Sequence, residues 1–74
     1  MNEYSFYPNP VTDEVTIEVA EPALVSIVNM QDVTVWRAQI QEVETISLKH
    51  LPAGLYIVSL ITKNKIHSKR LIRQ

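Results

Sequence analysis

The strongest constraint on this chain is the alternation of apolar and polar residues, because a period of two fits a β-strand and not an α-helix. The alternation is clearest from residue 15 to 19, where Val15, Ile17 and Val19 flank Thr16 and Glu18. It continues at Val25 and Ile27, at Ile46 and Leu48, and at Tyr56, Val58 and Leu60. β-branched residues, which strands prefer, are abundant, and no stretch of eleven residues fits an amphipathic helix better. The sequence therefore predicts an all-β fold.

Proline and glycine separate the alternating runs. Pro8 and Pro10 end the first run, Pro22 the second, and Pro52 with Gly54 precedes the most apolar run. Proline lacks the N–H that a β-ladder needs, so these positions mark strand ends. We expect strands at residues 3–7, 14–20, 23–30, 33–40, 43–48, 55–62 and 65–73. Seven short strands at this spacing indicate one seven-stranded immunoglobulin-like β-sandwich over residues 1–74.

The run 55–62 is apolar on nearly both faces and is therefore expected to be a central strand. We expect six side chains to be buried: Ile17, Val19, Ile27, Tyr56, Val58 and Leu60. The chain has no cysteine, so packing of its 46% hydrophobic residues must supply the stability that small domains often take from disulfides.

Two expected hairpin turns, Gln31-Asp32 and Asn64-Lys65, lack glycine. Asp and Asn tolerate a positive φ better than other non-glycine residues, so each turn can close with some strain. Gly54 is the only glycine. We expect it either to adopt a conformation that a Cβ would resist or to pack against a neighbouring strand.

The charges are unevenly distributed along the chain. Residues 1–44 hold all eight acidic residues and only one base, Arg37, whereas residues 45–74 hold six bases and no acid. The two halves could complement each other within one fold, or the basic half could form a docking surface for an acidic partner.

The printed sequence contains no signal peptide and no apolar run near the roughly 20 residues of a membrane span. The protein is therefore either cytosolic or carries its export signal on a part outside this sequence, and we expect no direct insertion into a membrane.

Little in the sequence indicates catalysis, and we expect no catalytic residues and no cofactor. The five serines, His50, His67, Asp13 and Asp32 form no local signature of a nucleophile and its base. Two histidines 17 residues apart, without cysteine, do not predict a metal site.

Nucleic-acid binding is also disfavoured. Arg70 and Arg73 could supply charge, and Trp36 and Tyr56 could stack on bases. The isoelectric point near 6.0 and the eight acids argue against it, because the acidic half would repel phosphate. Trp36, Tyr56 and Phe6 are interpreted as core or edge aromatics.

Four segments, in order, resemble motifs of the C-terminal sorting domains of the type IX (Por) secretion system, type A. They are residues 7–13 (YPNPVTD), 25–32 (VSIVNMQD), 51–58 (LPAGLYIV) and 68–73 (SKRLIR). The residues quoted from the family's first and third motifs are Tyr7, Pro8, Asn9, Pro10, Leu51 and Pro52. The family usually has glycine where Asp32 stands and often near Lys65, so those turns depart from its pattern.

The resemblance implies a C-terminal secretion signal. An N-terminal cargo domain would precede it, the outer-membrane type IX translocon would recognise it, and a sortase-like cysteine peptidase would remove it. The cargo would cross the periplasm to the cell surface or the extracellular space. Recognition is expected at Gly54, Tyr56, Lys69, Arg70, Leu71, Ile72 and Arg73.

Two other functions remain open. One is a non-cleaved immunoglobulin-like spacer in a secreted protein. The other is a carbohydrate-binding module with Trp36 or Tyr4 as its stacking platform.

Overall fold

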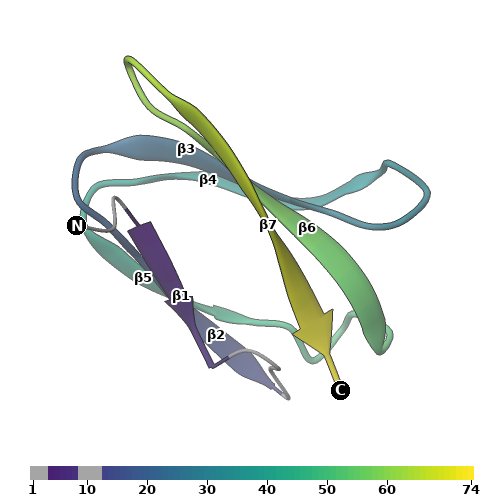
Figure 1. Ribbon diagram of the computed structural model, residues 1–74. Helices are drawn as coiled ribbons and strands as arrows, with labels where there is room; N and C mark the ends of the chain where they lie inside the picture. The colour runs from purple at the N-terminus through teal and green to yellow at the C-terminus, as the bar shows by residue number, and fades with distance from the viewer. Residues whose placement is uncertain (1–3, 9–12) are drawn as a thin grey trace.

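The computed structural model describes residues 4–8 and 13–74, which form seven antiparallel strands in two sheets. The strands are β1 (Tyr4–Tyr7), β2 (Glu14–Val19), β3 (Ala23–Val28), β4 (Thr34–Ile40), β5 (Val43–Ser47), β6 (Gly54–Ile61) and β7 (Ile66–Arg73). One sheet has the order β1-β2-β5 and the other β4-β3-β6-β7 (Figure 1). The predicted all-β, immunoglobulin-like sandwich is therefore confirmed, with strand ends within two residues of expectation where the chain is described.

The chain changes sheets three times, between β2 and β3, between β4 and β5, and between β5 and β6. β6 lies between β3 and β7 and is the central strand that its two apolar faces predict. The described residues contain no helix that is long and apolar enough to cross a membrane.

The core lies between the two sheets and consists of the inward-facing side chains, which are every second residue along the strands. The six residues expected in the core are all buried, and Ile17, Ile27 and Val58 have no exposed surface. The partly buried Phe6, Val35 and Trp36 pack against this core. Full burial of a large aliphatic side chain contributes about 1.5–3 kcal/mol, so packing takes the place of a disulfide.

The two glycine-free turns close in different ways. Asp32 has a φ of 66°, as expected for the β3–β4 hairpin, and the Asn29 side chain accepts hydrogen bonds from the N–H groups of Gln31 and Val33. A positive φ is not found at Asn64 or Lys65. In that turn the Lys65 N–H donates to Thr62 Oγ1 at 3.1 Å, and the Thr62 N–H donates to the Lys65 carbonyl at 2.9 Å.

Candidate recognition surface

Among residues 4–8 and 13–74, β7 is an edge strand whose one neighbour in the sheet is β6. Its register runs from Ile66 opposite Ile61 to Arg73 opposite Gly54, so all eight residues are paired on one side. The backbone groups on the other side point away from the sheet. A strand in this position can accept a further strand from a partner.

The alternation of β7 divides its side chains between two faces. Leu71 faces inward opposite Tyr56 and has no exposed surface, whereas Arg70 and Ile72 point outward. Ile72 is 47% exposed. The strand therefore closes the core with one face and presents a basic and an apolar side chain with the other.

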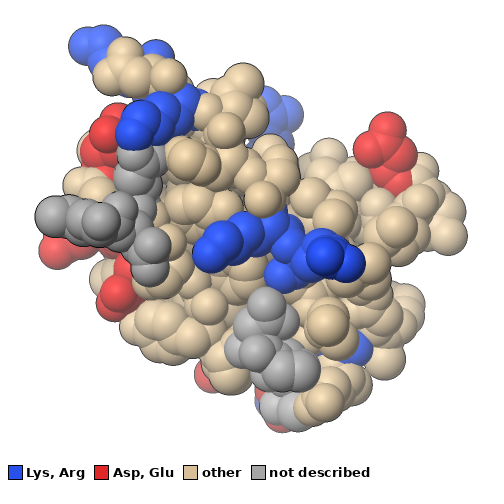
Figure 2. Space-filling view, in the orientation of Figure 1, with Lys and Arg blue, Asp and Glu red and all other residues tan. Residues whose placement is uncertain are grey.

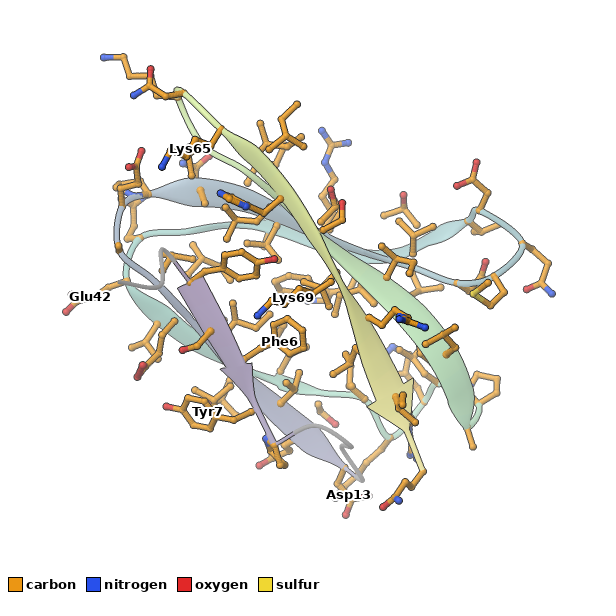
Figure 3. The ribbon with its side chains drawn as sticks, in the orientation of Figure 1. Phe6, Tyr7, Asp13, Glu42, Lys65 and Lys69 are labelled. Atoms are coloured by element: carbon orange, nitrogen blue, oxygen red, sulfur yellow. The ribbon has the colours of Figure 1, made fainter. Side chains whose placement is uncertain are left out.

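Lys69 and His67 lie on the inward side of β7, and the Lys69 side chain points towards β1 (Figure 3). Lys69 Nζ lies 5.7 Å from the centroid of the Tyr4 ring, and the His67 ring centroid lies 5.5 Å from that of Tyr4. Tyr4 is only 8% exposed, and burial raises the pKa of its phenol. A cation over an aromatic face is attracted by the ring quadrupole. The side chain of Lys69 therefore links the edge strands β7 and β1, although Lys69 is exposed to solvent.

Arg73 is tied to the fold. Its Nε donates to the Leu48 carbonyl at 2.8 Å, and a terminal guanidinium nitrogen donates to the Gln74 carbonyl at 2.6 Å. Half-buried Arg73 thus joins the end of β7 to the segment that follows β5. The charged guanidinium group donates both hydrogen bonds to backbone oxygens, and such charge-assisted hydrogen bonds are stronger than neutral ones.

The segment from Leu51 to Tyr56 forms a structural turn that leads into the central strand β6. The Tyr56 hydroxyl donates to the Pro52 carbonyl at 2.5 Å, which is the arrangement of a tyrosine corner in immunoglobulin-like domains. Gly54 has a φ of +150°, and apart from its own residue and its two chain neighbours no atom lies within 4 Å of the position its Cβ would take. The expectation that Gly54 adopts a backbone conformation that a Cβ would resist is therefore confirmed. Close packing of Gly54 against a neighbouring strand is not found.

The described part of the N-terminal motif lies at the end of β1. The exposed Tyr7 hydroxyl donates to the Glu18 carboxylate at 3.0 Å, and this hydrogen bond raises the Tyr7 pKa. Pro8 is exposed. Asn9 and Pro10 lie outside the described residues.

Basic side chains gather along the line of β7 in the view of Figure 2, and acidic ones lie towards its margins. Lys69 and Arg70 are the exposed basic residues of this strand. Among residues 4–8 and 13–74, no group of three or more His, Cys, Asp or Glu side chains could hold a metal ion. Tyr4 is buried and Trp36 packs against the core, so neither forms an open stacking platform for a sugar.

The structure thus brings the expected recognition residues to one end and one edge of the four-stranded sheet, but in different roles. Tyr56 and Leu71 are buried, Arg73 is anchored, Lys69 covers Tyr4, and Arg70 and Ile72 face outward. Sequence reasoning missed the tyrosine corner and the Arg73 anchor. The spacing of Tyr56 four residues after Pro52, just inside a central strand, is the signal that could have revealed the corner.

Comparison with known protein families gives one match that covers almost the whole chain. The model of a family described as "Secretion system C-terminal sorting domain" matches residues 5–74. No curated protein matches the chain significantly.

Proposed function

Because the chain belongs to the family of secretion-system C-terminal sorting domains, we propose that it directs an exported cargo protein through the outer-membrane type IX translocon. The cargo domain precedes it in the precursor and crosses the periplasm before reaching the cell surface or the extracellular space. A sortase-like cysteine peptidase then removes the domain. The order of the four motifs supports our further proposal that it is of type A.

The observation that best supports this function is the edge strand β7. It is an edge strand among the described residues, it presents Arg70 and Ile72 outward, and it is held by β6 and Leu71. A receptor can thus combine main-chain hydrogen bonds with side-chain recognition, and binding requires little ordering of the strand.

The seven expected recognition residues act in two ways in this proposal. Arg70 and Ile72 contact the translocon directly. Gly54, Tyr56, Leu71 and Arg73 hold β7 in the geometry that is recognised, and Lys69 contributes positive charge while it covers Tyr4. Positive charge along β7 would steer the domain towards an acidic receptor, an effect that weakens as salt increases.

The test is reversal of the Arg70 charge in a secretion assay. The domain is fused to a periplasmically exported reporter in a type IX-competent strain, and surface and secreted reporter are measured for wild type, Arg70→Glu and Arg37→Glu. Arg37 is a matched control because it is also an exposed arginine on an edge strand of the same sheet, β4. Substitutions at exposed sites usually change stability by less than about 0.5 kcal/mol, so both variants should fold.

We expect Arg70→Glu to lower secretion at least several-fold and Arg37→Glu to leave it near the wild-type level. Equal secretion of all three proteins, each with a normal thermal melt, would show that Arg70 is not recognised. Failure of the wild-type domain to export the reporter would contradict the sorting function itself and favour an uncleaved spacer.

A further inference from the structure

The outer face of the four-stranded sheet has small side chains in a line across the strands, between lines of large ones. Ser26, Ser59 and Ser68 lie in one cross-strand row, which ends at Arg37 on β4. One adjacent row is apolar, with Leu24, Ile61 and Ile66, and the other runs from Val28 and Ile57 to Arg70. A row of serines between rows of branched aliphatic side chains leaves a depression in the sheet surface.

Two adjoining depressions occupy this region, and we call them together the outer groove. One has a volume of about 330 Å³ and the other about 310 Å³, and both are lined by Ile57 and Ser68. The first extends under the β3–β4 hairpin to Met30 and Asp32, and the second ends at Lys69 and Arg70 on β7. The groove therefore runs from the hairpin across β6 to the edge strand.

The groove is apolar in the middle and oppositely charged at its ends. Ile57, Val28 and the 61%-exposed Met30 supply apolar surface, and the hydroxyl groups of Ser59 and Ser68 supply hydrogen-bonding capacity. Asp32 makes one end acidic, and Arg70 makes the other basic. Complementary charge fixes both the orientation and the identity of a bound segment.

We propose that the outer groove binds a short extended segment of the translocon receptor, and this inference rests on the proposed sorting function. The segment presents an acidic side chain to the β7 end, apolar side chains to Ile57, and a basic or N–H donor group to Asp32. The groove crosses two strand spacings, roughly 10 Å, which an extended chain covers in about three residues. The receptor thus contacts this face in addition to the edge of β7.

The surface fits a protein segment better than a sugar or a second copy of the domain. The described residues of this outer face include no aromatic ring on which a sugar could stack, because Trp36 shares the inward side with its partner Ile27. A second copy placed face to face would oppose groove to groove and leave both hollows unfilled. A protruding peptide segment fills them.

The experiment measures the affinity of purified outer-membrane translocon complex for the immobilised domain by biolayer interferometry. Ser68→Tyr places a large side chain in both depressions and suits a strand. Ser47→Tyr is its matched control, because Ser47 is an exposed serine in an edge strand of the opposite sheet. Thermal melts of both variants establish folding, and Ser68→Gln replaces Ser68→Tyr if the tyrosine variant does not fold.

We expect Ser68→Tyr to weaken binding at least tenfold and Ser47→Tyr to remain within twofold of wild type. If the wild-type domain binds and Ser68→Tyr binds with the same affinity, the groove is not the binding site, and the sorting function is unaffected by that result. Absence of binding by the wild-type domain overturns both. If sedimentation shows a wild-type dimer that Ser68→Tyr abolishes, the occupant is a second copy and the receptor segment is excluded.

Discussion

At Gly54 the backbone conformation itself selects the residue. Its φ of +150° is one that L-residues rarely adopt, while the space around its missing Cβ is empty. Any cost of substitution is therefore conformational rather than steric. We expect Gly54→Val to lower the free energy of unfolding by about 1–3 kcal/mol.

Chemical denaturation of Gly54→Val and Ala53→Val checks this prediction. Ala53 is the exposed preceding residue and has no positive φ, so the same substitution there should change stability little. Equal midpoints for the two variants would mean that the loop relaxes without cost.

Asp32 stands at the second position where a left-handed conformation is required. Its φ of 66° costs a β-branched residue more than it costs aspartate or glycine. We expect Asp32→Val to lower stability by about 1–2 kcal/mol, whereas Asp32→Gly keeps or raises the melting temperature. Calorimetry of both variants measures the difference, and a lower melting temperature for Asp32→Gly than for Asp32→Val would contradict it.

At the level of elements, the sequence predicts each strand but not which strands meet across the sandwich. Alternation is local, so β2 and β6 could be predicted with their inward residues, and Pro22 and Pro52 mark breaks between strands. The contact of Lys69 with Tyr4 joins the last and first strands and leaves no local pattern. The hydrogen bond from Arg73 to the Leu48 carbonyl likewise joins distant parts of the chain and could not be predicted from a local pattern.

The junction between β1 and β7 should make the domain sensitive to alkaline pH. Burial raises the pKa of Tyr4 above its ordinary value of 10.0, so the folded state favours the neutral phenol. This stabilisation is complete below pH 10 and is lost as pH rises through the folded-state pKa. We therefore expect Tyr4→Phe to lose less stability than wild type as pH rises above 10.

Urea titrations of wild type and Tyr4→Phe at increasing pH measure the effect. The phenylalanine ring still faces Lys69 and His67, so Tyr4→Phe keeps the ring contacts between β1 and β7. Identical alkaline slopes for wild type and Tyr4→Phe would show that the Tyr4 phenol is not coupled to folding.

At the scale of the whole molecule, the strand proposed for recognition is also part of the cooperative core. β7 pairs along its entire length with the central strand, and Leu71 is fully buried. Replacing one buried leucine with alanine typically costs 2–5 kcal/mol. A domain of this size has a total stability of roughly 4–11 kcal/mol. Loss of the whole strand should therefore exceed what the remaining six strands can supply.

We expect deletion of residues 66–74 to unfold the domain. The alternative would be a folded six-stranded sandwich that the receptor does not bind. Without β7, the core-facing Tyr56, Val58 and Leu60 lose their cover on the edge side, and β6 becomes an exposed apolar edge strand. Far-UV circular dichroism and one-dimensional proton NMR should show a disordered chain, whereas removal of Gln74 alone should leave a cooperative melt. A truncated protein that still melts cooperatively would mean that β7 is an appendage to the fold. Secretion lost on truncation would in that case report recognition directly.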